Sequence, residues 1–218
     1  MSEQLDPEEV RDLMNAVWSR LDDAVTAHGG IIDKHIGDAL MALFGAGTAR
    51  EDDAERALRA ALAMQQQIDE LEREAPADAP RLSLRIGVHT GPVILGCVGS
   101  RSEYTAMGDT VNIASRLEHA APVGGILASH DSYRHVRGAF DVTSLAPLAV
   151  KGKSEPVRAY LVRGAKRRGS SLLDRRVAGI ETPLVGRDAQ LAMLQAGLRH
   201  VVDAHGARLF TVVAEAGL

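Results

Sequence analysis

The sequence has a single cysteine, no long apolar run and no strong excess of either charge, and each shortage excludes a class of protein. One cysteine, Cys97, cannot form a disulfide within the chain, so a disulfide-stabilised scaffold is excluded. We expect Cys97 to be a small core residue in a reducing cytosol. No stretch approaches the roughly 20 apolar residues of a membrane-spanning helix. The net charge of −4 gives no basic footprint for nucleic acid.

The remaining composition is that of a soluble globular protein. The first residues, MSEQLDPEE, are neither basic nor apolar in the manner of a secretory signal, so we expect a cytoplasmic protein without a membrane partner. The 218 residues, 45% of them hydrophobic and 25% charged, allow one full domain and part of a second.

The most informative stretch is His28–Gly45, HGGIIDKHIGDALMALFG. Two apolar runs, Ile31–Ile36 and Ala39–Phe44, are joined by Gly37 and Asp38. A Gly-X pair between such runs predicts a two-residue β-hairpin, with the acid at its tip. Asp and Gly are also the ordinary residues of turns, so the pair alone leaves open whether the acid is functional.

Amphipathic helices are predicted on both sides of this hairpin. Asp6, followed by Pro7 and two glutamates, has the features of a helix start. Apolar residues then recur at helical spacing until Gly29 and Gly30. A second helix is predicted from Glu51-Asp52-Asp53 to the proline-containing residues 75–80.

The next segment predicts two strands and a loop. Leu82–Val88 alternates as a half-buried strand does, a turn follows at His89, and a second strand is expected over Val93–Val98. We expect residues 99–107 to form a polar loop. His89 is a candidate functional group, although a histidine at a strand end is more often structural.

A third helix is predicted from Gly108-Asp109-Thr110 to about His119. A strand over residues 125–128, a short helix from Asp131 and a closing hairpin of residues 140–150 and 156–162 follow. This order indicates an α+β fold in which helices pack on one face of a split sheet.

Three segments, in this order, resemble the class III nucleotidyl cyclase family. They are the hairpin positions Lys34, Gly37, Asp38, Met41, Phe44 and Gly45, the string RIGVHTGPVILGCVG, and the string EYTAMGDTVNIASRLE over residues 103–118. The resemblance implies a ferredoxin-like cyclase catalytic domain over residues 1–164. In that family a strand bearing a first metal-binding Asp precedes the first helix, so we expect the domain to be incomplete at its N-terminus.

The resemblance implies an adenylate cyclase that converts ATP to 3′,5′-cyclic AMP and pyrophosphate. Two Mg²⁺ or Mn²⁺ ions are expected in each active site, which two protomers of a homodimer share. Asp38 is then a metal ligand, Asn112 orients the ribose, and Arg116 neutralises charge on the phosphate. Asn112 and Arg116 are spaced to project from one helix face, which for an isolated pair is also the pattern of a solvated surface.

Lys34 and Thr105 stand at the family's purine-selecting positions. A lysine only donates and a threonine hydroxyl can accept, which suits the N1 acceptor and 6-amino donor of adenine. Thr105 replaces the commoner Asp and thereby resembles the bicarbonate-responsive, soluble-adenylate-cyclase-like subgroup. Lys151 and Lys153, in the turn of the closing hairpin, either reach the triphosphate or are solvated.

The C-terminal part predicts a second domain. Residues 165–182 resemble a flexible basic linker. Residues 183–218 resemble the start of a P-loop ATPase of the AAA or signal-transduction type, with a helix from Asp188 to about His205 and a strand over Leu209–Val213. The sequence ends before the Gly-Lys-Ser/Thr that binds phosphate and magnesium, so we expect no ATPase activity from this chain.

Two alternatives to an adenylate cyclase remain open. One is a guanylate cyclase, although cyclases of that specificity carry an acid at the position of Lys34. The other is a catalytically inactive cyclase-like module that dimerises and regulates the ATPase. Because the strand with the partner carboxylate is missing, we expect weak activity or none from the chain itself.

Overall fold

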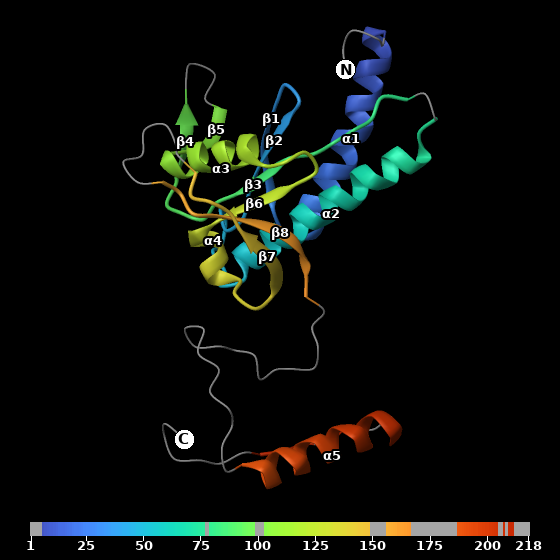
Figure 1. Ribbon diagram of the computed structural model, residues 1–218, viewed down its shortest axis with the longest axis vertical. Helices are drawn as coiled ribbons and strands as arrows, with labels where there is room; N and C mark the ends of the chain where they lie inside the picture. The colour runs from blue at the N-terminus through green and yellow to red at the C-terminus, as the bar shows by residue number, and fades with distance from the viewer. Residues whose placement is uncertain are drawn as a thin grey trace. The chain divides into compact units, whose positions relative to one another are not determined.

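The computed structural model divides the chain into two compact units, Met1–Ser171 and Leu172–Leu218 (Figure 1). The residues that the structure describes are 6–76, 79–98, 103–148, 156–166, 187–204, 207 and 209–211. In this part of the chain no helix is long and apolar enough to cross a membrane.

The second unit contains helix α5, Asp188–Ala204, which confirms the predicted helix. Residues 209–211 lie in no strand, so the described part of the strand predicted over Leu209–Val213 is not found. Three predicted segments lie outside the described residues: the last two residues of that strand, the phosphate-loop segment, and residues 167–182 of the linker.

Two long helices begin the first unit. Helix α1, Pro7–Ala27, starts with a capping box. The Asp6 side chain accepts the backbone N–H of Glu8, and the Glu9 side chain accepts the backbone N–H of Asp6. Helix α2, Asp53–Glu74, packs along it. Their contact buries one set of apolar side chains, Val17, Leu21, Ala24, Val25, Met64 and Ile68. Both helices confirm the predicted pattern.

A four-stranded sheet forms the centre of the first unit. Its strands lie in the order β3 (Ile86–Val88), β6 (Ile126–Ser129), β8 (Ala159–Ala165) and β7 (Phe140–Ser144). Strands β3 and β6 are parallel, and the other neighbours are antiparallel. The closing hairpin is confirmed as β7 and β8, whereas the strand predicted from Leu82 is regular only over its last three residues.

Helices cover both faces of this sheet, so the expected single helical layer is wrong. On one face Ile126 and Ala128 pack with Leu58 of α2. On the other face Leu127 packs with Leu117 of helix α3, Asp109–Ala120. All four residues of β6 are buried, as expected for a strand covered on both sides.

Gly87 of β3 allows α3 to approach the sheet closely. A Cβ atom at this position would overlap the carbonyl oxygen of Ala114 and the amide nitrogen of Glu118. Both atoms belong to the backbone of α3 and cannot turn away as a side chain can. A glycine is therefore required where the helix backbone lies against the strand.

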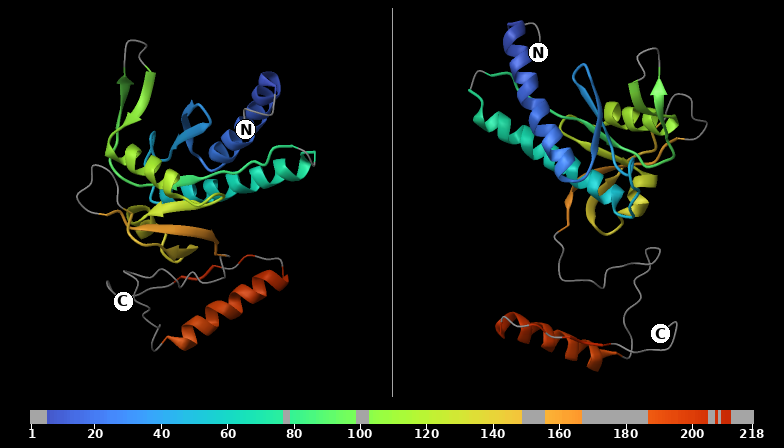
Figure 2. Two further views of the ribbon diagram at one scale, coloured as in Figure 1. Left: turned by 45° about the horizontal axis from the view of Figure 1, so that its top comes forward. Right: turned by 180° about the vertical axis from the view of Figure 1, so that it is seen from behind.

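Two separate hairpins extend on the same side of the four-stranded sheet (Figures 1 and 2). The first, β1 (Ile31–Ile36) with β2 (Ala39–Leu43), is the predicted one, and Gly37 at its turn has φ +61°. The second joins β4 (Ile94–Val98) to β5 (Glu103–Met107).

Strand β5 corrects two expectations. The polar loop expected over residues 99–107 is wrong for its second half, because β5 pairs along the whole of β4 and cross-strand pairing outweighs local polarity. Cys97 of β4 is exposed and is not a core residue. A two-stranded hairpin leaves side chains exposed that a wider, covered sheet would bury.

Replacing Gly87 tests the close approach of α3. We expect Gly87→Ala to lower the free energy of unfolding by about 1–3 kcal/mol, because the added methyl group meets backbone atoms. The matched control is Gly164→Ala in β8, where a Cβ atom meets nothing within 4 Å, and there we expect a change within about 0.5 kcal/mol. Denaturant unfolding measures both, and equal stabilities would contradict this packing.

Candidate functional site

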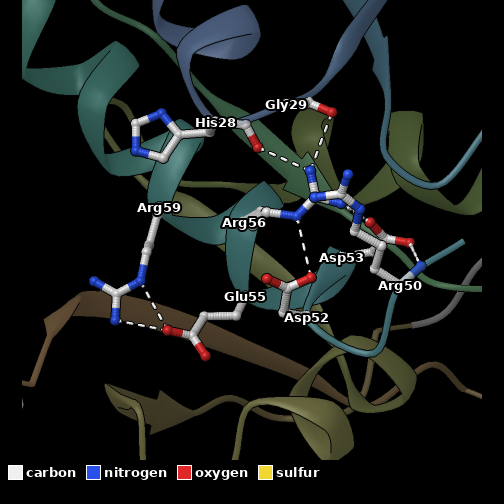
Figure 3. A network of polar contacts seen from close by, with 8 residues as sticks. All are labelled: His28, Gly29, Arg50, Asp52, Asp53, Glu55, Arg56 and Arg59. Atoms are coloured by element: carbon white, nitrogen blue, oxygen red, sulfur yellow. Dashed lines mark hydrogen bonds and ion pairs between the residues drawn. The ribbon is translucent and has the colours of Figure 1, made fainter. Parts of the chain in front are cut away.

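Arg56 of α2 fixes the connection from α1 into the first hairpin (Figure 3). Its guanidinium donates to the carbonyl oxygens of His28 and Gly29, each at 3.1 Å. It also forms ion pairs with Asp52 and Asp53, and its side chain is only 18% exposed. Hydrogen bonds from a charged, largely buried donor are among the stronger ones in proteins.

The same turn of α2 also holds the end of the hairpin. Asp53 accepts a hydrogen bond from the backbone of Arg50 at 2.7 Å. A Cβ atom at Gly45, which has φ +82°, would overlap the Asp53 carboxylate. The residues before β1 and after β2 are thus both packed against the start of α2, and this places the hairpin that carries Lys34 and Asp38.

Asp38 is exposed at the hairpin tip. It makes no hydrogen bond or ion pair with the described part of the chain. A free carboxylate suits a hard cation such as Mg²⁺. No group of three or more His, Cys, Asp or Glu side chains that could hold a metal ion occurs among the described residues. Asp38 therefore fits as one ligand and does not complete a metal site with these residues.

The structure brings Lys34 and Thr105 together around a third residue, Asp33. The hydroxyl of Thr105 donates to Oδ2 of Asp33 at 2.6 Å, and the backbone N–H of Ala106 donates to Oδ1 at 3.2 Å. The Lys34 ammonium lies 3.7 Å from the same Oδ2. The two predicted base-selecting residues thus share a carboxylate partner.

Sequence analysis missed Asp33. The available signal was an acid within the otherwise apolar start of a strand, where Asp is unfavourable. Its side chain is 4% exposed, and a carboxylate buried to that extent requires hydrogen-bond donors. The structure supplies them from β5, which the sequence had indicated as a loop.

Asn112 and Arg116 lie on α3, each directly before one of its buried residues, Ile113 and Leu117. Asn112 is exposed and Arg116 is half-buried. Neither side chain has a hydrogen-bond or ion-pair partner among the described residues, so both are available to a ligand. Lys151 and Lys153 lie outside the described residues.

His89 belongs to a partly buried network of hydroxyl groups. Its Nδ1 lies 2.8 Å from the hydroxyl of Ser129, and the hydroxyl of Thr90 lies 2.9 Å from that of Ser132. Both serines are fully buried. This network joins the end of β3 to the start of helix α4, His130–His135, and it supports the structural role that is the commoner one for a histidine at a strand end.

The chain belongs to a known enzyme family. Residues 1–164 match the family described as the adenylate and guanylate cyclase catalytic domain. The adenylate cyclase of Anabaena cylindrica is 37% identical over 175 residues, which cover 75% of this chain and 34% of that protein. The guanylate cyclase soluble subunit beta-2 of Rattus norvegicus is 30% identical over 160 residues, which cover 72% of this chain and 23% of that protein.

Solved structures agree with this assignment. The adenylyl cyclase CyaB from P. aeruginosa superposes with a TM-score of 0.72 at 33% identity, over 76% of this chain and 88% of that one. The guanylate cyclase domain of RhGC from Catenaria anguillulae gives 0.68 at 30% identity, over 76% and 89%. The first unit is therefore a cyclase catalytic domain with the mixed α+β fold of that family. The chain spans about a third or less of the curated relatives above.

Replacing Arg56 tests the anchoring of the first hairpin. We expect Arg56→Met to lower the free energy of unfolding by about 2–4 kcal/mol, because two carbonyl groups and two carboxylates lose their donor. Arg73→Met on the same helix is the control, since that side chain is 72% exposed, and its effect should stay within about 0.5 kcal/mol. Denaturant unfolding measures both, and equal losses would exclude this role of Arg56.

Proposed function

We propose that the first unit is the catalytic domain of an adenylate cyclase, which converts ATP to 3′,5′-cyclic AMP and pyrophosphate. The observation that carries the proposal is the placement of Lys34 and Thr105 around Asp33. A lysine donor beside a threonine acceptor complements N1 and the 6-amino group of adenine. Guanine presents the opposite pattern at both positions.

The reaction joins the ribose 3′-oxygen to the α-phosphorus as pyrophosphate leaves. Arg116 carries a charge that can stabilise the negative charge developing on the phosphate. Asn112, four positions earlier on the same helix, can hold the ribose in place. Mg²⁺ or Mn²⁺, two per site, would supply Lewis-acid stabilisation of the attacking and leaving oxygens, with Asp38 as one ligand.

We further propose a homodimer with two composite sites, in which Asp38 comes from one protomer and Asn112 and Arg116 come from its partner. Large apolar side chains on the two hairpins support this interface. Ile31 is 51% exposed, Ile36 56% and Ile94 70%. Apolar side chains gathered on neighbouring surfaces commonly mark a site of association.

A guanylate cyclase is the second candidate, favoured by relatives of that specificity at 30% identity. An inactive dimerising module is the third, and the incomplete metal-ligand set of the described residues favours it. Residues 165 and 166 of the predicted linker belong to the first unit, because Ala165 lies in β8 and Lys166 donates its backbone N–H to Ala139. We retain residues 167–182 as a proposed linker and residues 183–218 as a proposed start of a P-loop ATPase. Helix α5 supports the second assignment.

Mixing two inactive variants tests both the activity and the shared site. In the protein extended upstream by its native coding sequence, we expect Asp38→Ala and Arg116→Ala each to abolish formation of cyclic AMP from ATP with Mg²⁺ or Mn²⁺, since every site then lacks one group. In a co-refolded equimolar mixture half of the dimers carry one intact site, so about a quarter of the wild-type activity should return.

The outcomes of this mixing experiment separate the candidates. A mixture as inactive as the separate variants would contradict the composite site. A protein extended upstream by its native coding sequence that turns over neither ATP nor GTP would favour the inactive module, because weak activity or none is expected of the chain itself. Size-exclusion chromatography of each variant verifies that dimers form.

Reversing the charge of Lys34 tests base recognition. We expect Lys34→Glu to shift the ratio of kcat/KM for ATP to that for GTP toward GTP by about tenfold or more, because the new acceptor pairs with the N1–H of guanine. Steady-state kinetics with both nucleotides measures the ratio. An unchanged ratio would remove the role assigned to Lys34.

A further inference from the structure

We propose that Asp33 is a positioning residue for base selection, which holds the hydroxyl of Thr105 in the orientation that accepts a hydrogen bond from adenine. This inference rests on the proposed function and deepens it, because it concerns how the same site distinguishes the two purines. Asp33 is not itself expected to touch the nucleotide.

A β-bulge makes this arrangement possible. The pairing of β1 with β2 shifts register between Ile32 and Lys34, so Asp33 between them has no partner on β2. In a regular strand the side chains of Asp33 and Lys34 would point to opposite faces. A bulge redirects the side chain of the extra residue, and here the Asp33 carboxylate reaches β5 while the Lys34 ammonium stays 3.7 Å away.

The hydrogen bond fixes the direction of the Thr105 proton. A carboxylate only accepts, whereas a hydroxyl has one proton to donate and lone pairs to accept. The Thr105 hydroxyl donates its proton to Oδ2 of Asp33, with 2.6 Å between the two oxygens. Only the lone pairs of the hydroxyl therefore remain for a ligand. Thr105 is 6% exposed and the Asp33 side chain 4%. At such burial water competes little for the proton.

The carboxylate is itself held in place. Its second oxygen accepts the N–H of Ala106, the residue that follows Thr105 on β5. Donors from two adjacent residues therefore hydrogen-bond to both oxygens of the Asp33 carboxylate, and this limits rotation of the side chain. Thr105 and Asp33 are 72 positions apart in the sequence. The two hydrogen bonds therefore also connect the β1–β2 hairpin to the β4–β5 hairpin.

These orientations discriminate between purines. The 6-amino group of adenine donates, and it meets an acceptor at Thr105. The 6-carbonyl of guanine accepts, so it would face the lone pairs of Thr105 and remain unpaired in a buried position. Sites that leave a buried polar group unpaired reject that ligand strongly. Without Asp33 the Thr105 hydroxyl could donate or accept, and with Asp33 it can only accept, which makes it selective for adenine.

The test is Asp33→Asn, assayed with both nucleotides. An asparagine can turn its amide so that it donates to Thr105, which frees the hydroxyl proton for the carbonyl of guanine. We expect the ratio of kcat/KM for ATP to that for GTP to fall about tenfold. The control is Asp22→Asn, whose carboxylate lies 3.0 Å from Nε2 of His35, the neighbour of Lys34 in β1, and which should leave the ratio unchanged.

A second variant shows whether Asp33 acts through Thr105. In a Thr105→Val background the hydroxyl is gone, so Asp33→Asn should no longer alter the ratio. A purely structural role of Asp33 would lower the rates with ATP and GTP alike, together with the melting temperature, and would leave the ratio in place. Equal effects of Asp33→Asn with and without Thr105 would also overturn the inference.

The result with the wild-type chain separates this inference from the proposed function. Wild-type turnover that prefers ATP, with the ratio unchanged in Asp33→Asn, would overturn the role of Asp33 alone. A protein extended upstream by its native coding sequence that turns over neither nucleotide would overturn the proposed function and this inference with it. Should Asp33→Asn not fold, Asp33→Glu and Asp33→Gln give the same comparison, and the inference fails if their ratios are equal.

Discussion

Burial of strand β6 on both faces is the constraint on which the first unit depends. Ile126 and Ala128 pack toward α2 while Leu127, between them, packs toward α3. A strand of this kind must be covered by a helix on each side, because exposing either face would leave large apolar area in water. The two helices are then fixed relative to one sheet, and so are the residues on their other sides.

The candidate site is built outward from these layers. Helix α3 carries Asn112 and Arg116 beside its buried residues Ile113 and Leu117. Helix α2 holds the first hairpin through Arg56, and Asp33 joins that hairpin to the second through β5. Two-stranded hairpins are marginal on their own, so these polar contacts give the site residues defined positions that the hairpins alone would not.

Family and substrate are decided by different parts of the molecule. The fold and residues 1–164 define a cyclase catalytic domain, yet adenylate and guanylate cyclases both superpose on it with similar TM-scores. The shared fold therefore does not specify the base, and in the proposed function a few donors and acceptors choose it. Lys34, Thr105 and Asp33 are the residues at which that choice is proposed to be made.

The sequence by itself determined the elements that local patterns specify. The capping box at Asp6, the helical periodicity of α1 and α2, and the Gly37-Asp38 turn all depend on residues close to one another in the chain. Only the tertiary structure decided that β5 is a strand, that helices cover both faces of the sheet, and that Asp33 joins Thr105. Each of these depends on partners far apart in sequence, and a pattern within one segment carries no information about which distant atoms will satisfy it.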